Sequence, residues 1–183
     1  MRELSLHILD VLENSVEAGA TRIELFIEED VERDSLTITI KDNGRGMSDE
    51  LVQQVLNPFF TTRTTRHVGL GLPLFAAAAR RCDGDLRIQS QVGAGTKVTA
   101  TFGLNHVDRA PLGDIGGSLM AVMLSERPVD IAYRHKVDGH TFELDTADVR
   151  HELGDVPLSH PLVREWLEST LAEGLAGLQR PLP

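Results

Sequence analysis

The first part of the chain alternates between two kinds of hydrophobic spacing. Residues 3–18 place apolar side chains at helical intervals, which predicts an amphipathic helix that ends at Gly19. Residues 21–28 and 36–40 alternate apolar and polar positions, which predicts the two strands of a hairpin. Similar patterns predict the later elements in this order: a helix over 48–56, a loop over 57–70, a helix over 73–82, and strands over 86–92 and 97–102.

This order of elements favours an α+β fold, in which helices cover one face of a sheet in a two-layer α/β sandwich. The composition changes after Phe102, and the polar stretch 105–113, with its proline and glycine, is typical of a linker. We therefore predict two domains, residues 1–104 and residues 105–183.

The second segment has the pattern of a small α/β appendage built as helix, hairpin and helix. Asp114 is a predicted N-cap for a helix that ends at Leu124, and Asp138-Gly139 between two alternating runs is a strong hairpin signal. Pro161 begins the last predicted helix. Trp166 and the leucines around it are most simply the core of this appendage, and a partner or dimer surface is the alternative.

Composition and charge exclude several classes of protein. No apolar run approaches the roughly 18 to 20 residues of a membrane-spanning helix, and the first residues lack the pattern of a signal peptide. We therefore expect a cytoplasmic protein that does not enter a membrane. The 18 basic and 28 acidic residues leave a net charge of −10, which argues against nucleic-acid binding. Cys82 is the only cysteine, so an internal disulfide and a cysteine-based zinc site are excluded.

Two segments carry polar side chains suited to a ligand. Asp10 and Asn14 lie four residues apart, so they share one face of the first helix. An amide oxygen there suits Mg²⁺, and a carboxylate one turn earlier can orient or deprotonate a water. Asp42 ends a strand just before a glycine turn, where a buried carboxylate can accept a hydrogen bond from an exocyclic amine such as that of adenine. A plain Asp-Asn-Gly turn is the alternative for this segment.

Two further segments are rich in glycine. Gly69-Leu70-Gly71 leads into a helix, and backbone amides at such a helix start form an anion site that phosphate usually fills. The segment is neither a P-loop nor a dinucleotide fingerprint, because the Gly-Lys-Ser/Thr ending and an immediately preceding strand are both missing. Residues 93–96 are by themselves equally consistent with a hairpin turn. Each segment is weak alone, whereas the order and spacing of all four are specific.

Together the four segments resemble the sequence boxes of the Bergerat-fold ATPases, the superfamily of DNA gyrase, heat-shock chaperones, histidine kinases and mismatch-repair ATPases. The resemblance covers residues 1 to about 104 and implies a mixed sheet with helices on one face. The matching segments are residues 12–21 with the N-box, 42–47 with the first glycine box, 57–63 with the phenylalanine box of histidine kinases, and 69–72 and 93–96 with the second and third glycine boxes.

The resemblance implies ATP and Mg²⁺ as ligands. Asn14 would coordinate the Mg²⁺, and Asp42 would accept the adenine amino group with Thr96 beside it. Asp10 stands where the gyrase and mismatch-repair branches carry a catalytic Glu. Its side chain is shorter by roughly 1 Å, so we expect hydrolysis to be slow or absent. The residues expected to contact ATP are Asn14, Asp42, Gly44, Gly46, Met47, Arg63, Arg66, Gly69, Leu70, Gly71, Leu72 and Thr96.

Three functions fit this resemblance. The first is a Mg²⁺-dependent ATP-binding switch with weak ATPase activity, which controls a protein partner through a lid over residues 57–68 or through the C-terminal segment. The second is a protein kinase of the anti-sigma or dehydrogenase-kinase kind, and the third is a non-catalytic interaction module. Only nine residues precede Asp10, so we expect no upstream phosphoacceptor helix pair and take His7 for an ordinary helix-face residue. The sequence leaves hydrolysis, phosphotransfer and oligomeric state open.

Overall fold

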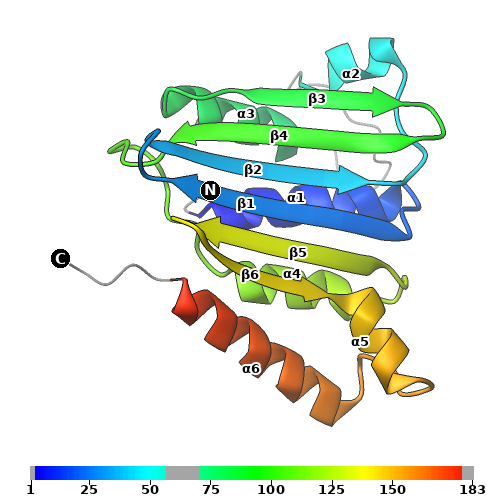
Figure 1. Ribbon diagram of the computed structural model, residues 1–183. Helices are drawn as coiled ribbons and strands as arrows, with labels where there is room; N and C mark the ends of the chain where they lie inside the picture. Colours follow the sequence, from blue (N-terminus) through cyan, green and yellow to red (C-terminus); the bar gives the residue numbers. More distant parts are fainter. Residues whose placement is uncertain (1–2, 57–70, 179–183) are drawn as a thin grey trace.

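The computed structural model describes residues 3–56 and 71–178 (Figure 1). Its elements follow in the order α1 (Leu4–Glu17), β1 (Arg22–Asp30), β2 (Ser35–Asp42), α2 (Asp49–Val55), α3 (Gly71–Arg81), β3 (Leu86–Gln91), β4 (Gly95–Gly103), α4 (Ile115–Met123), β5 (Asp130–Val137), β6 (His140–Asp145), α5 (Thr146–Leu153) and α6 (Pro161–Gly177).

The hydrophobic pattern predicted these elements with two differences. Helix α3 begins at Gly71, so Pro73 is its third residue rather than its first. Helix α5 was not predicted, because it follows β6 directly and is mostly polar. Its start is nevertheless marked by a capping side chain, since the Asp145 carboxylate accepts a hydrogen bond from the backbone N–H of Ala147 at 2.9 Å.

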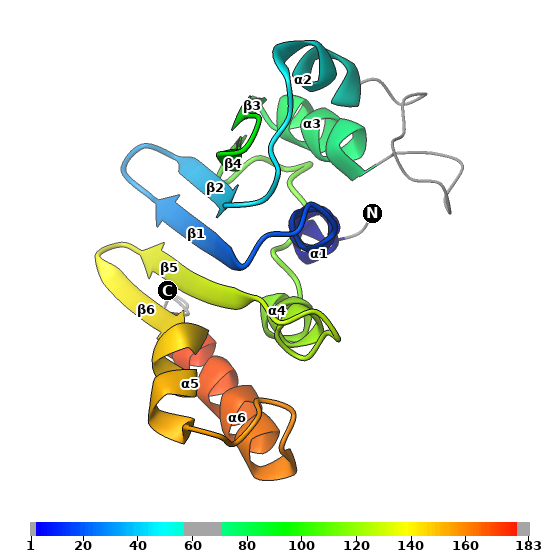
Figure 2. The ribbon, with the colours of Figure 1, turned by 90° about the vertical axis from the view of Figure 1, so that its right-hand side faces the viewer.

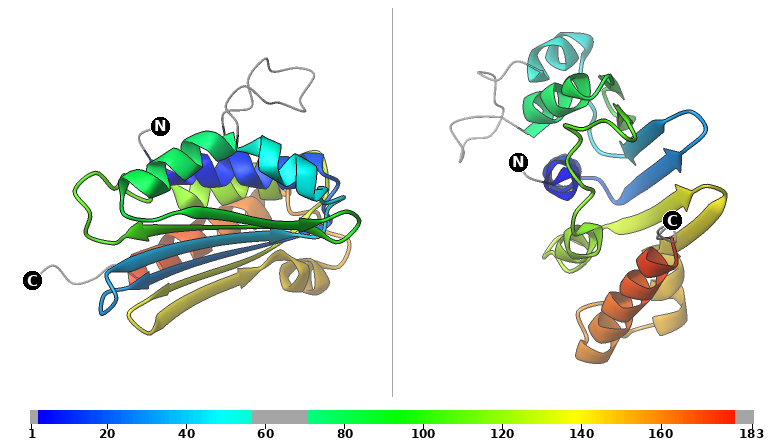
Figure 3. Two further views of the ribbon diagram at one scale, coloured as in Figure 1. Left: turned by 90° about the horizontal axis from the view of Figure 1, so that it is seen from above. Right: turned by 90° about the vertical axis from the view of Figure 1, so that its left-hand side faces the viewer.

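The six strands form one mixed sheet in the order β3-β4-β2-β1-β5-β6, which confirms the predicted α+β class. Strand β1 pairs antiparallel with β2 and parallel with β5, and the remaining neighbours are antiparallel. Helices α1, α3 and α4 lie on one face of the sheet (Figure 2), while α5 and α6 lie beside β6 (Figure 3). No helix of the described ranges is long and apolar enough to cross a membrane.

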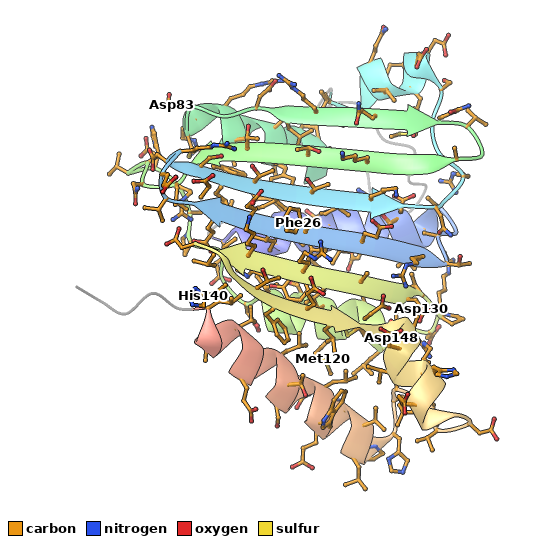
Figure 4. All side chains as sticks on the ribbon, in the orientation of Figure 1. Phe26, Asp83, Met120, Asp130, His140 and Asp148 are labelled. Atoms are coloured by element: carbon orange, nitrogen blue, oxygen red, sulfur yellow. The ribbon has the colours of Figure 1, made fainter. Side chains whose placement is uncertain are left out.

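Alternation along the strands decides which face receives the helices. In β1 the side chains of Ile23, Leu25 and Ile27 are buried beneath the helices. Phe26 points to the opposite face, where polar and charged side chains predominate (Figure 4). The sheet therefore has one apolar face that packs on the helices and one polar face.

The C-terminal segment continues this sheet. Strand β5 pairs with β1 along its length, and the buried apolar residues of both segments belong to one cluster. Sheet and core thus run across the proposed boundary at residue 104, and the division into two domains stays a prediction.

The predicted placement of Trp166 in a core is wrong. Its side chain is 50% exposed and that of Leu162 is 69% exposed, whereas Leu167 and Leu171 are fully buried. Helix α6 packs on α4 and β6 through the stripe that includes Val163, Leu167 and Leu171 at four-residue spacing. Trp166 lies one position before Leu167, about 100° around the helix axis, and its side chain is only half covered.

Candidate functional site

Three polar side chains lie in one row across the sheet, at the end of β2. Asp42 of β2 is in register with Thr96 of β4, and Thr96 is in register with Ser90 of β3. Directly opposed residues in a sheet point to the same face. A row of carboxylate and two hydroxyls therefore forms on the helix side of the sheet, and two of its members were predicted site residues.

Both oxygens of the Asp42 carboxylate are held by donors. The residue is only 8% exposed. The Ser15 hydroxyl donates to Oδ2 at 2.8 Å, and the backbone N–H of Gly44 donates to Oδ1 at 2.8 Å. Each carboxylate oxygen keeps a further lone pair. The group is therefore fixed in position and can still accept a hydrogen bond from an exocyclic amine.

The glycines of the turn after β2 allow backbones to approach closely. Gly46 has a φ of 66°, and a Cβ there would overlap the carbonyl oxygen of Gln91. A Cβ on Gly44 would lie 2.9 Å from the Cβ of Ala18. Packing of the turn against α1 and β3 thus requires glycine at these positions. The expectation that they also leave room for a nucleotide stays a prediction.

Asn43 ties this turn to the connection between α1 and β1. Its Oδ1 accepts hydrogen bonds from the backbone N–H groups of Thr21 and Arg22, both at 2.9 Å, and its amide nitrogen donates to the Thr21 hydroxyl. The N–H of Arg45 also donates to the carbonyl of Ala18 at 3.0 Å. The turn is consequently rigid relative to the end of α1.

The helix α1 residues lie beside the start of α3. A Cβ on Gly71 would lie 3.2 Å from the Cβ of Asp10 and 3.4 Å from its Oδ2. Asn14 follows Asp10 by one helical turn and is half-buried. The structure therefore places the Asp10 carboxylate beside the N-terminus of α3, with Asn14 one turn further along α1. A helix N-terminus attracts anions through its free N–H groups and its dipole.

The donors at this place suit Mg²⁺. The Asn14 amide oxygen is a hard ligand, and Mg²⁺ takes few ligands from the protein while keeping several waters. A phosphate at the start of α3 would be repelled by the Asp10 carboxylate unless a cation lay between them. The residues present therefore fit a magnesium ion that accompanies a phosphate ligand.

Several predicted contacts fall outside the described residues. These are Arg63, Arg66, Gly69 and Leu70, whose roles stay predictions. Two other residues predicted to contact ATP lie within the described ranges. Leu72 is the second residue of α3, and Met47 donates its backbone N–H to the Ser90 hydroxyl at 2.8 Å.

Sequence reasoning missed two side chains of the site. Ser15 follows Val11 by four positions in the buried stripe of α1, and Ser90 continues the inward alternation of Leu86 and Ile88 in β3. In both cases a hydroxyl occupies a position that the period assigns to an apolar side chain. That signal was visible, but only the structure shows which partners satisfy the hydroxyls.

His7, predicted to be an ordinary helix-face residue, lies on the buried face of α1. It is 4% exposed, and its ring stacks on Phe75 of α3 with centroids 5.1 Å apart and planes 6° apart. Its Nδ1 is buried without a hydrogen-bond partner among the described residues. Burial lowers the pKa of the imidazole to about 4, so the ring is neutral near pH 7.

Comparison with protein families supports the interpretation of this site. Residues 2–106 match the family described as "Histidine kinase-, DNA gyrase B-, and HSP90-like ATPase". The matched stretch contains α1, the glycine turn, α3 and the third glycine segment, so every predicted site residue lies within it.

Individual relatives match the same part of the chain. The sensor protein kinase FleS of Pseudomonas aeruginosa is 37% identical over 108 residues, which are 59% of this chain and 26% of that protein. Sporulation kinase C of Bacillus subtilis is 30% identical over 94 residues, 51% of this chain and 22% of that protein. A putative sensor protein of Shewanella frigidimarina is 30% identical over 109 residues, 58% of this chain and 17% of that protein. The chain therefore matches only a minor part of each of these proteins.

One solved structure has a similar fold across more of the chain. It is described as the N terminal domain of a DNA repair protein, and its TM-score is 0.55 with 13% sequence identity. The similarity covers 79% of this chain and 53% of that one. At this identity it supports the fold alone.

Proposed function

The chain belongs to the histidine kinase-, DNA gyrase B- and HSP90-like ATPase family, and on that premise we propose that it binds ATP with Mg²⁺ between α1, the glycine turn and the start of α3. Family membership supports nucleotide binding by the domain. The single observation that carries the proposed site is the convergence on α1 of a buried, doubly held carboxylate and the N-terminus of α3.

The two ends of the nucleotide would meet different chemistry. Asp42 would accept the adenine amino group, because its carboxylate is fixed and retains acceptor capacity. The phosphates would lie toward the start of α3, where backbone amides and the helix dipole favour negative charge. Asn14 would hold the Mg²⁺, which when bound neutralises part of the phosphate charge.

Asp10 is the proposed general base for slow hydrolysis. It would take a proton from a water whose oxygen bonds to the γ-phosphorus, while the bond from that phosphorus to the β,γ-bridging oxygen breaks. Because aspartate reaches less far than glutamate, we propose that turnover is weak. We further propose that the nucleotide bound by the protein controls a protein partner. The third possibility, a module that holds nucleotide without catalysis, corresponds to complete loss of this step.

Phosphotransfer to a protein partner is a second candidate function. It is favoured by the relatives, which include proteins named sensor protein kinase and sporulation kinase. In that reaction a side chain of the partner replaces water as the nucleophile, so a short carboxylate at position 10 matters less.

The fate of γ-labelled ATP distinguishes these candidates. Pure protein with Mg²⁺ is incubated with the label, alone and with cell extract, and free phosphate and labelled protein are measured. Free phosphate from the pure protein that is lost in Asp10→Ala supports the switch with ATPase activity. The matched control is Glu13→Gln, another carboxylate on α1, which should retain turnover.

Label on an extract protein without free phosphate would instead establish the kinase. Phosphate release that is unchanged in Asp10→Ala would contradict the proposed role of this carboxylate. If neither free phosphate nor labelled protein forms while ATP binding is retained, the non-catalytic module is established.

A further inference from the structure

The Ser90 hydroxyl lies in the same row as Asp42 and Thr96 and contacts three polar groups. Its Oγ accepts a hydrogen bond from the backbone N–H of Met47 at 2.8 Å. It also lies 3.0 Å from the carbonyl oxygen of Gly95 and 2.8 Å from the hydroxyl oxygen of Thr96. Met47 belongs to the glycine turn after β2, and Gly95 and Thr96 are the first two residues of β4, so one hydroxyl of β3 connects that turn to the start of β4.

Counting hydrogens decides the direction of these bonds. A serine hydroxyl has one hydrogen to donate and two lone pairs that accept. The Gly95 carbonyl can only accept, so Ser90 donates its hydrogen there. Thr96 then donates its own hydrogen to Ser90. The reverse direction would leave the oxygens of Ser90 and Gly95 3.0 Å apart with no hydrogen between them.

We infer that Ser90 is a positioning residue for base selection, because it fixes the direction of the Thr96 hydroxyl. With its hydrogen committed to Ser90, Thr96 Oγ1 presents only lone pairs beside the Asp42 carboxylate. Two neighbouring acceptors suit the amino group at position 6 of a purine, which carries two hydrogens. They disfavour a 6-oxo purine, whose oxygen would meet acceptors on the protein. This role rests on the ATP site proposed above.

The test compares the dissociation constants of ATP and ITP, which differ in the amino or oxo group at purine position 6. Both are measured by calorimetry with Mg²⁺, for wild type and Ser90→Ala. The substitution frees the Thr96 hydroxyl, which can then rotate and donate to an oxo group. We expect the ratio of the ITP constant to the ATP constant to fall about tenfold, the effect of one hydrogen bond.

The ratio separates positioning from a merely structural role. If Ser90 only stabilised the turn, Ser90→Ala would weaken the binding of ATP and of ITP equally. The ratio of the two dissociation constants would then stay unchanged, and this result would overturn the proposed role of Ser90. Ser90→Thr keeps a hydroxyl and is expected to restore the ratio. Thr101→Val is the matched control, since that hydroxyl bonds the backbone of Asp85 at the other end of β4, and it should leave the ratio as in wild type.

A second variant keeps the role testable if Ser90→Ala does not fold. Thr96→Val removes the oriented hydroxyl and should lower the same ratio. Where both folded variants are available, adding Ser90→Ala to Thr96→Val should lower it no further, because the two act through one group. A further fall in the double variant would contradict the inference. Wild-type protein that binds ATP but does not discriminate against ITP would overturn the role of Ser90 alone, whereas failure to bind ATP would overturn the proposed function with it.

Discussion

At the scale of single residues, polar groups beneath the helices have contrasting surroundings. Asp42 is buried and bonded through both oxygens, and its donors come from α1 and from the turn that follows β2. His7 is buried against Phe75, and its Nδ1 has no partner in the described part of the chain. The first arrangement fixes two acceptor oxygens in place, while the second keeps a ring neutral near pH 7.

The burial of His7 predicts a dependence of stability on pH. Its pKa is lowered from 6.5 to about 4, so the unfolded chain binds the proton more readily than the folded protein. The contribution of this ring to the free energy of unfolding is full above pH 6.5 and falls by about 3 kcal/mol as the pH drops to 4. Urea unfolding at several pH values, compared between wild type and His7→Leu, measures this term.

The difference between the two proteins isolates His7 from the carboxylates that titrate in the same range. We expect His7→Leu to gain stability relative to wild type as the pH falls from 6.5 to 4. Parallel curves for the two proteins over this range would show that His7 is accessible to protons in the folded state.

At the scale of elements, helix α6 is attached to the rest of the protein through one side only. Leu167 and Leu171 are buried, while Leu162 on the same helix is mostly exposed. Leu171→Ala should lower the free energy of unfolding by about 3 kcal/mol, because it removes buried apolar volume. The matched substitution Leu162→Ala should change it by less than about 0.5 kcal/mol. Chemical denaturation of the two variants checks this, and equal losses would contradict the packing of α6.

Local patterns predicted most helices and strands but not which strands pair with one another. The strand periods of residues 21–28 and 36–40 and the cap at Asp114 depend on adjacent residues, and the structure agrees with them. The parallel pairing of β1 with β5 joins residues more than 100 positions apart, and no local pattern records such a pairing. For the same reason the sequence pointed to Asp42 and Thr96 but not to Ser90, which the register of β3 with β4 places opposite Thr96.

At the scale of the whole molecule, one sheet and one apolar cluster join the two segments of the chain. This predicts a single cooperative unfolding transition, since removal of β5 would expose the edge of β1 and part of the core. Trp166 is the only tryptophan, so its fluorescence reports on α6 alone, while far-UV circular dichroism reports on all helices and strands. Coincident urea transitions are expected, whereas two separate transitions would support independent domains divided near residue 104.

The most direct test of the account is calorimetric titration of ATP, with Mg²⁺ or with a chelator, into wild type, Asp42→Asn and Asn14→Ala. Wild type should bind ATP with Mg²⁺. Asp42→Asn should bind at least about tenfold more weakly because an amide group replaces an acceptor oxygen, and Asn14→Ala should lose Mg·ATP binding. Equal affinity in wild type and Asp42→Asn would contradict the placement of adenine, and Mg·ATP binding that survived Asn14→Ala would contradict the placement of the metal.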